Sequence, residues 1–453
     1  LKTGRHALPG VIQHVSLDVE GDLWFASFSG LFQARYMPFV TWRTPLEIPT
    51  ERVINIDNPS DGSIWFSGFG GICQLPPGGL EPILKIPRPT NEVAHCNVDQ
   101  NGNLWIHKGA GRFSYRRAGE NTESTVQTGG ERIFHVSTTV DEKGFFWASA
   151  HTGLFFCDPN KTPLKLERAS GKNGLPTEGS YLIIHKNNND LIAAFRDRGI
   201  YRRSAGASTW EAVNSPEDNV AKLTGIFDQD LQGRIWGVAS RLETISCWQG
   251  NTTGRVEFSA LGFGDLVITG LIADDIGNLW ISTRNNGVAT LDCDDLLAAM
   301  NDSSVRPRVT WFDALSGLGS KGCTFTHDAL KKSPDGRIWV ASNGGLSAIQ
   351  PALWKEEIKR ASLQDVMIKA CAADGRNLPL TPSMQVPAGS SRFGIQLNVL
   401  SFGFPGEINY RYRLLGHSDQ WIDGTGDNEA SFQKIPPGNY HFEVVASNRF
   451  GIW

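Results

Sequence analysis

The chain has 453 residues, a formal net charge of −4, 40% hydrophobic and 20% charged residues, which is an ordinary globular balance. No run approaches the roughly 18 apolar residues that a membrane-spanning helix requires. The sequence has no block of Lys or Arg that could form a basic stripe, so we expect no nucleic-acid partner for this region. The 49 Gly, 23 Pro and 14 Trp are scattered along the chain and predict many short strands joined by turns.

The cysteines do not form a recognisable site. Their odd number, their wide spacing and the lack of a CxxC motif argue against a disulfide framework and a zinc site. We therefore expect no metal and no other cofactor, and we expect small buried hydrophobes at Cys73, Cys96, Cys157, Cys247, Cys293, Cys323 and Cys371.

One phrase recurs along the chain and organises it. An acidic or polar turn with Gly leads into Leu or Ile, then Trp, then an apolar residue, and a short loop leads on to Gly and another apolar residue, most clearly at residues 275–288 and 335–346. A degenerate copy has Ile192 in the Trp position, and the other copies are marked by Trp24, Trp65, Trp105, Trp147, Trp236, Trp280 and Trp339. The copies are 40 to 45 residues apart, except for a last step of 59 that includes an expected short helix and loop at residues 294–303.

A step of about 40–45 residues is the size of one four-stranded propeller blade. In residues 279–281 successive side chains point to opposite faces of a strand, and all are apolar, so such a strand must be covered on both sides. Blades stacked around an axis provide that cover, and the Asp-x-x-Gly turns supply the hairpins. Eight copies predict eight blades, and seven remains open. An open solenoid is the alternative, which the lack of a helical period disfavours. We expect the all-β propeller to span residues 1–350.

The pattern changes after Pro351. Residues 351–360 predict a short helical linker, and residues 361–453 alternate as short strands without the Trp phrase. About 90 residues of short strands predict an immunoglobulin-like β-sandwich, with its last strand expected to be cut off at Trp453. Because the sequence starts at Leu1 without a Met and stops at Trp453, we expect further segments outside it.

Two resemblances follow from these motifs. The repeated phrase resembles the two-component regulator propeller repeat. Residues 410–416, Trp421, residues 437–442 and residues 446–453 resemble the triple-tyrosine (Y_Y_Y) domain, with Tyr410, Tyr412 and Tyr440 as counterparts of its name-giving tyrosines. Together they cover nearly the whole chain, and the order of propeller and then triple-tyrosine module is specific.

In this family the pair forms the extracytoplasmic sensor of membrane histidine kinases, including hybrid ones. The resemblance therefore implies a sensor on the periplasmic side of a bacterial inner membrane, with its membrane anchor and kinase outside this chain. It also implies that a small polar ligand or an oligosaccharide binds to the sensor and that the binding signal is relayed through the immunoglobulin-like module. A homodimer through the sandwich stays open, and so does a cytoplasmic location with a soluble DNA-binding output.

Common catalytic motifs do not occur in the sequence. There is no HExxH, no GxSxG and no P-loop, so no catalytic residue is predicted in this chain. A propeller lyase or glycoside hydrolase and a protein-interaction scaffold remain alternatives.

A candidate ligand-binding face comes from spacing. Four His precede a repeat Trp by ten or twelve residues, and even offsets put them on one face of the blade's innermost strand, near the channel mouth. The loops just after the Trp strands should reach the same side. The polar candidates are His14, His95, His135, His327, Lys108, His151, Arg196, Arg241, Arg284 and Asn343, with Phe28 and Phe69 as aromatic neighbours. Such a mouth suits a sugar or an organic acid. The alternative is that the His cap strand ends and that the loops are simply solvated.

Overall fold

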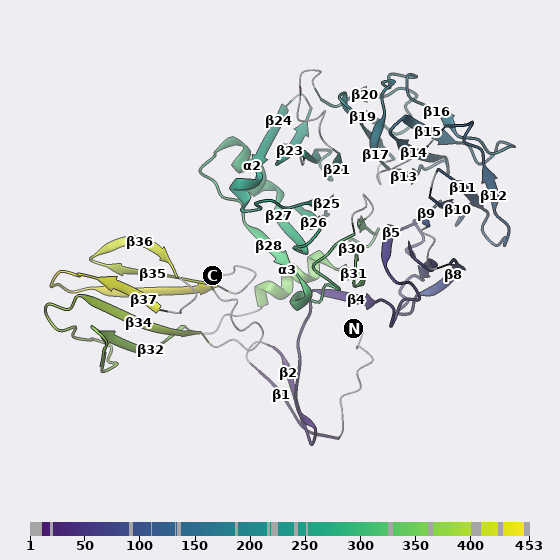
Figure 1. Cartoon of the computed structure of the whole chain (residues 1–453). Helices are drawn as coiled ribbons and strands as arrows, with labels where there is room; N and C mark the ends of the chain where they lie inside the picture. Colours follow the sequence, from purple (N-terminus) through teal and green to yellow (C-terminus); the bar gives the residue numbers. More distant parts are fainter. Residues whose placement is uncertain are drawn as a thin grey trace. The chain divides into compact units, whose positions relative to one another are not determined.

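A computed structural model describes most of the chain (Figure 1). The described residues are 11–18, 21–89, 94–109, 111–131, 133, 137–185, 189–214, 218, 225–239, 243–250, 252–324, 329–360, 366–399, 409–424 and 429–447. The chain divides into two compact units, of which one is Met37–Ala352 and the other combines Thr3–Tyr36 with Leu353–Trp453. Within the described residues, no helix has both the length and the apolar character needed to cross a membrane.

The unit Met37–Ala352 is a ring of seven four-stranded antiparallel blades (Figure 1). The first blade is β5 (Val53–Asp57), β6 (Ile64–Gly68), β7 (Gly71–Leu75) and β8 (Ile83–Pro87). The second is β9 (His95–Val98), β10 (Leu104–His107), β11 (Phe113–Arg116) and β12 (Ser124–Val126). The third is β13 (Ser137–Val140), β14 (Phe146–Ala150), β15 (Gly153–Cys157) and β16 (Glu167–Arg168).

The remaining blades follow the same order. The fourth is β17 (Ser180–His185), β18 (Leu191–Phe195), β19 (Gly199–Arg203) and β20 (Glu211–Ala212). The fifth is β21 (Ile226–Gln229), β22 (Ile235–Ala239), β23 (Thr244–Gln249) and β24 (Thr252–Glu257). The sixth is β25 (Ile268–Ala273), β26 (Asn278–Thr283), β27 (Val288–Asp292) and β28 (Val309–Phe312). The seventh is β29 (Leu330–Lys332), β30 (Ile338–Ser342), β31 (Gly345–Ile349) and β4 (Phe39–Arg43).

Short helices connect some strands. They are the 3-10 turns η2 (Phe258–Leu261) and η3 (Ala314–Ser316) and the helix α2 (Cys293–Asn301). Helix α2 confirms the helix expected in the long last step, and the Asp292 carboxylate caps it by accepting the backbone N–H groups of Asp294 and Asp295.

A local device explains why the repeat forms a hairpin. In the sixth blade the Asp274 carboxylate accepts the backbone N–H groups of Ile276 and Asn278, which closes the turn. Its other oxygen accepts the indole N–H of Trp280 at 2.8 Å, six residues on. Gly277 takes the positive φ of 90° that the turn requires. The same indole-to-carboxylate bond recurs from Trp24 to Asp18, from Trp147 to Asp141 and from Trp236 to Asp230.

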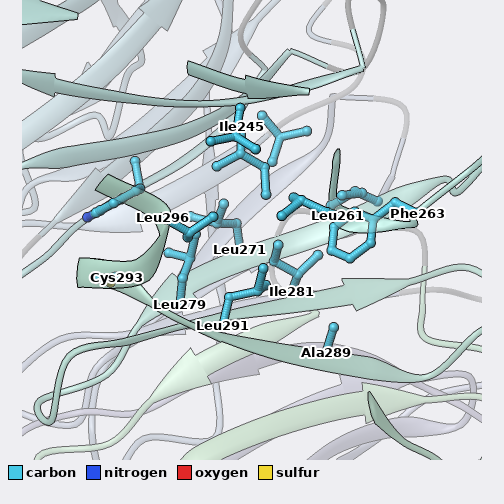
Figure 2. Close-up of a cluster of buried hydrophobic side chains, with 14 of the residues drawn as sticks. Ile245, Leu261, Phe263, Leu271, Leu279, Ile281, Ala289, Leu291, Cys293 and Leu296 are labelled. Atoms are coloured by element: carbon cyan, nitrogen blue, oxygen red, sulfur yellow. The ribbon is translucent and has the colours of Figure 1, made fainter. Parts of the chain in front are cut away.

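Apolar layers between blades form the core. Figure 2 shows the layer between the fifth and sixth blades, where Ile245 of β23 faces Leu271, Leu279 and Ile281, and where α2 adds Leu296. Among the repeat tryptophans, Trp105, Trp236 and Trp280 are almost completely buried, so they are part of this core, as expected.

The first strands of the blades lie around the axis and are joined by polar side chains. The Asn55 carboxamide oxygen accepts the backbone N–H of Cys96 at 3.0 Å, and the Asp57 carboxylate accepts that of Val98 at 2.6 Å. Because both partners advance by two residues, β5 and β9 run in the same direction. Asp228 makes the equivalent bond to the backbone of Ala273. Neighbouring blades are therefore held together at the axis by hydrogen bonds as well as by apolar packing.

The ring closes with seven blades. β4 pairs with β31, from Phe39 opposite Ile349 to Arg43 opposite Gly345, and β29 lies beside β5. The copy around Trp24 forms a separate three-stranded sheet of β1 (Ile12–Leu17), β2 (Leu23–Ser27) and β3 (Gly30–Ala34). The copy around Trp24 is thus not an eighth blade of this ring, because β4, the strand that follows this copy, completes the seventh blade. The ring comprises Met37–Ala352, whereas the sequence placed its start at residue 1.

The C-terminal part of the other unit is a sandwich of two antiparallel sheets. One has the order β33 (Arg376–Leu378), β32 (Val366–Ala373), β34 (Arg392–Val399), β37 (Glu429–Gln433) and the other the order β36 (Ser418–Asp423), β35 (Asn409–Leu415), β38 (His441–Ser447). Tyr410 and Tyr412 are buried between them with Phe432. Tyr440 donates its hydroxyl to the Pro436 carbonyl at 2.6 Å. The expected linker is the helix α3 (Pro351–Arg360).

All seven cysteines are buried, as expected. Burial raises the pKa of the Cys73 thiol to about 12, so the thiol stays protonated and packs as an apolar side chain.

Candidate functional site

The turn after each Trp strand lies at the end of the blade where the first strand begins. In the second blade the pairing of His95 with His107 shows this directly, because His95 starts β9 and His107 ends β10. Lys108 follows at once, so His95 and Lys108 lie at the same end. Since neighbouring first strands run in the same direction, the corresponding turns of all blades emerge at one end of the ring. We call this end the turn face, and among the predicted residues it carries His95, Lys108, His151, Arg196, Arg284 and Asn343.

Several predicted residues do not belong to a blade of this ring or are not described. His14 lies in β1 and Phe28 lies in the turn after β2, and both are exposed residues of the other compact unit. The reason is that the repeat around Trp24 is not a blade of this ring. His135, His327 and Arg241 lie outside the described residues.

A residue that sequence reasoning missed, His107, packs beside His95. The two rings are 5.8 Å apart between centroids, and His107 stacks on Phe113 at 4.7 Å. Burial and, to a lesser degree, the neighbouring His95 lower the pKa of His107 from 6.5 to about 4, so His107 is neutral at pH 7. Its Nε2 is buried and has no hydrogen-bond partner within the described part of the chain. The signal in the sequence that could have identified His107 is its position directly after the repeat Leu-Trp-Ile.

Lys108 does not offer a free charge to a ligand. Its ammonium group lies 2.5 Å from one oxygen of Glu123, and the Arg88 guanidinium lies 2.5 Å from the other. Ser114 adds a hydrogen bond to the same carboxylate. Burial by itself would raise the pKa of Glu123, but the bonds from Lys108 and Ser114 and the charge of Arg88 outweigh it and lower that pKa. These groups therefore form a structural ion network across two blades.

His151 and Arg196 meet across the border of the third and fourth blades. One Nη of Arg196 lies 3.0 Å from Nδ1 of His151, and both side chains are exposed. Because guanidinium is only a donor, this contact requires Nδ1 to accept, which leaves the imidazole proton on Nε2. Arg198 forms a second exposed pair with Glu178 at 2.6 Å. The hydrogen bond from Arg198 lowers the pKa of Glu178, which keeps this carboxylate charged.

Arg284 and Asn343 stand on turns that are anchored through the backbone. The Arg284 N–H donates to the Val267 carbonyl at 2.9 Å, and the Asn343 N–H donates to the Gly322 carbonyl at 2.9 Å. Both side chains are exposed. Pinned turns with exposed donor groups can present a guanidinium and an amide to a ligand from fixed positions, at a small cost in ordering entropy.

The turn face as a whole offers hydrogen-bond donors and positive charge. Arg196, Arg284 and Asn343 supply NH groups, and His151 can supply its Nε2 proton. These groups match the oxygens of sugars, carboxylates or other anions. Within the part of the chain that is described, no group of three or more His, Cys, Asp and Glu is arranged to hold a metal ion.

Comparisons with known proteins fit this architecture. Residues 401–453 match the model of the Y_Y_Y domain. No curated protein matches. Among solved structures, the extracellular domain of BT3049 from B. thetaiotaomicron, described as a hybrid two component system, is 18% identical with a TM-score of 0.70, and the match covers 98% of this chain and 60% of that one. The extracellular domain of BT4673 from the same organism is 16% identical with a TM-score of 0.52, covering 98% and 61%.

These likenesses confirm the predicted class of protein, a β-propeller followed by an immunoglobulin-like module. They also confirm the resemblance of its C-terminal module to the Y_Y_Y domain. The chain spans about three fifths of the length of the two extracellular domains that it resembles.

Proposed function

We propose that this chain is the extracytoplasmic ligand-sensing region of a two-component signal transduction protein. The observation that carries the proposal is the match to the BT3049 extracellular domain, which extends over 98% of the chain and therefore over both the propeller and the Y_Y_Y module. A propeller alone would support many functions. The combination of a propeller and a Y_Y_Y module in this order favours a sensing function over the other functions of propellers.

The ligand binds at the turn face, through Arg196, His151, Arg284 and Asn343. The exposure and the anchoring of these residues support this assignment. Their side chains are exposed hydrogen-bond donors on neighbouring or backbone-anchored turns. Lys108, by contrast, is neutralised by Glu123, so it positions the second blade rather than the ligand. A small polar ligand or an oligosaccharide that carries carboxylate or hydroxyl oxygens fits this set of donors.

The signal passes through the immunoglobulin-like module to an anchor and a histidine kinase outside this chain. Such a relay requires a ligand that binds one arrangement of the protein more tightly than another. A soluble DNA-binding output with a cytoplasmic location is the competing version. No observation on the described residues favours a lyase, a glycoside hydrolase or a scaffold over the sensor.

Two experiments test the proposal separately. The first is a binding screen with neutral oligosaccharides, uronic-acid oligosaccharides and organic acids, read as a rise in melting temperature and then measured by titration calorimetry. We expect Arg196→Ala and Arg284→Ala each to weaken the binding of a hit by tenfold or more, because each removes a charge-assisted hydrogen bond. Arg376→Ala, an exposed arginine of the sandwich, is the matched control and should bind normally. Unchanged affinity in both test variants refutes the site.

The second experiment addresses the sensing role itself. The parent reading frame should encode a membrane span and a kinase beyond Trp453. If it encodes neither a membrane span nor any output domain, the sensor proposal fails, whatever the binding data show.

A further inference from the structure

We propose that the turn face carries a subsite for one negatively charged oxygen group of the ligand, a carboxylate or a sulfate ester, between the sixth and seventh blades. The proposal rests on the proposed function and adds the chemistry of one part of the ligand. The subsite consists of Arg284, Ser320, Lys321 and Asn343, which we call the inter-blade cluster. Ser320 and Lys321 lie on a connection between blades, where the spacing of the repeat gives no signal.

The connection from β28 to β29 starts at the turn face. Phe312, the last residue of β28, pairs with Val288, the first residue of β27, which directly follows the turn that carries Arg284. Further along the connection, the Lys321 carbonyl accepts the backbone N–H of Gly287 at 2.7 Å. Lys321 is therefore bonded through its backbone to the turn of the sixth blade.

Gly322 brings the turn of the seventh blade to the same place. Its carbonyl accepts the backbone N–H of Asn343 at 2.9 Å. A Cβ atom at Gly322 would lie 2.6 Å from Nδ2 of Asn343 and 3.3 Å from the carbonyl oxygen of Arg284. The Asn343 carboxamide and the Arg284 backbone therefore both lie next to the connection. Three chain segments that are distant in sequence thus bring donor-bearing residues together.

The connection is held in a fixed position relative to the turn of the seventh blade. A Cβ atom at Gly344 would collide with the carbonyl oxygen of Gly319, so the two backbones are in direct contact. The Ser347 hydroxyl of β31 also accepts the backbone N–H of Gly319 at 3.1 Å. A backbone fixed in this way presents the Ser320 and Lys321 side chains at a small cost in ordering entropy.

The cluster offers hydrogen-bond donors that have no acceptor within the described part of the chain. The Arg284 guanidinium and the Asn343 carboxamide are exposed, and neither side chain makes a hydrogen bond or an ion pair to a described residue. The backbone N–H groups of Ser320 and Lys321 donate to no described residue either. Guanidinium, ammonium and backbone N–H groups only donate, so they match a ligand group that only accepts hydrogen bonds.

The charge of the cluster fits a single negative charge on the ligand. Arg284 and Lys321 each carry one positive charge, and the Lys321 ammonium lies 3.5 Å from the Asp313 carboxylate. Among the described residues, Asp313 is the one carboxylate that pairs with the cluster, so one positive charge remains uncompensated. A carboxylate or a sulfate ester supplies one negative charge. A phosphate monoester, with about −1.5 to −2 at pH 7, would leave excess negative charge beside Asp313.

Other cations of the turn face are more tightly paired. The Lys108 ammonium lies 2.5 Å from Glu123, and the Arg198 guanidinium lies 2.6 Å from Glu178. The ion pair of Lys321 is longer, and its side chain is 63% exposed, so water screens the pair and it contributes little. A ligand oxyanion can therefore engage Lys321 without first breaking a strong ion pair.

The test uses two small probes, sodium methyl sulfate and sodium glucuronate, titrated into residues 1–453 at constant ionic strength. The backbone amide NMR shifts of Ser320, Lys321 and Gly322 report binding, and sodium chloride is the reference for general salt effects. We expect saturable shifts with at least one probe. Competition between both probes marks a site for either group, binding of glucuronate alone marks a carboxylate site, and binding of methyl sulfate alone marks a sulfate-ester site.

Variants of the connection separate charge from geometry. Lys321→Gln should weaken binding of the probe at least fivefold, because it removes a charge-assisted hydrogen bond, whereas Lys321→Arg should retain binding. Gly322→Ala should also weaken binding, because it displaces the flexible end of the Asn343 side chain without changing any charge. Lys172→Gln, at an exposed position of the connection from β16 to β17, is the matched control and should bind normally.

Three results would overturn the proposal. One is a set of shifts that do not saturate with either probe or that chloride reproduces, because the cluster would then respond only to salt. Another is unchanged affinity in Lys321→Gln. The third is an equal loss in Lys172→Gln, because the effect would then come from the overall charge of the turn face.

Failure of this subsite can be told apart from failure of the proposed function. If a hit from the binding screen responds to Arg196→Ala but not to Lys321→Gln, the subsite is refuted and the proposed function stands. A parent reading frame without an output domain refutes the sensor, whereas the probe titrations keep their meaning.

Discussion

The sixth blade and the sheet β1–β3 have the same turn device and the same register, but they differ in burial. Trp280 of the sixth blade is completely buried, whereas Trp24 is only partly covered. The comparison separates two contributions to the structure and stability of a blade that usually occur together. The local hydrogen bonds specify how the strands pair, and the neighbouring blades supply the apolar burial that stabilises them.

The largest expected effect comes from removing the repeat tryptophan on each side of this comparison. Trp280→Ala should destabilise the ring by about 3–5 kcal/mol, because it leaves a cavity in a close-packed layer. Trp24→Ala should change the free energy of unfolding of the ring by less than about 0.5 kcal/mol, as for an exposed site. Urea denaturation followed by tryptophan fluorescence measures both. Equal losses would mean that β1–β3 contributes to the same cooperative unit as the sixth blade.

Burial inside the ring should also appear as pH dependence. The pKa of His107 is about 4 in the folded state and near 6.5 in the unfolded chain. Between these values the unfolded chain binds a proton that the folded protein excludes, so stability should fall as the pH decreases from 6.5 to 4. The full effect of this one group is about 3 kcal/mol.

The measurement is the free energy of unfolding across this pH range. His107→Phe, which keeps an aromatic ring beside Phe113, should remove this part of the pH dependence. His441→Gln, at an exposed position of the sandwich, should leave it unchanged. The same slope in His107→Phe as in the unchanged protein would show that another group is responsible.

A smaller effect is expected from the turn carboxylates. Asp274→Ala removes the acceptor of the buried Trp280 indole and of the backbone N–H groups of Ile276 and Asn278, and should cost about 1–3 kcal/mol. Asp18→Ala removes the same kind of acceptor from a sheet that water reaches, so the ring transition should not move. Thermal unfolding of both variants decides this. A comparable loss in Asp18→Ala would contradict the separation of local pairing from burial.

The positions of candidate-site residues within one blade were predictable from the register of its hairpins. His95 and Lys108 lie at one end of their blade because antiparallel pairing between adjacent strands allows no other arrangement. The contacts of these residues were not predictable. Lys108 meets a carboxylate whose other oxygen is held by Arg88 of the preceding blade, and Arg196 meets His151 from 45 residues earlier. Such contacts depend on how blades stack, which no single repeat encodes.

The sequence by itself determined the blades, because in most copies of the phrase the acceptor and the Trp lie only six residues apart and form their bond within one hairpin. Even the degenerate copy at Ile192 forms the expected strand, β18, since apolar residues on both of its faces suffice. Ring membership was decided only by the tertiary structure. The phrase around Trp24 is locally as good as the others, yet β4 leaves it to pair with β31, and the Thr41 and Ser347 hydroxyls that meet there are 306 residues apart. Closure is a property of the whole ring, because it depends on how many blades of this twist fit around the axis, and no local pattern records that number.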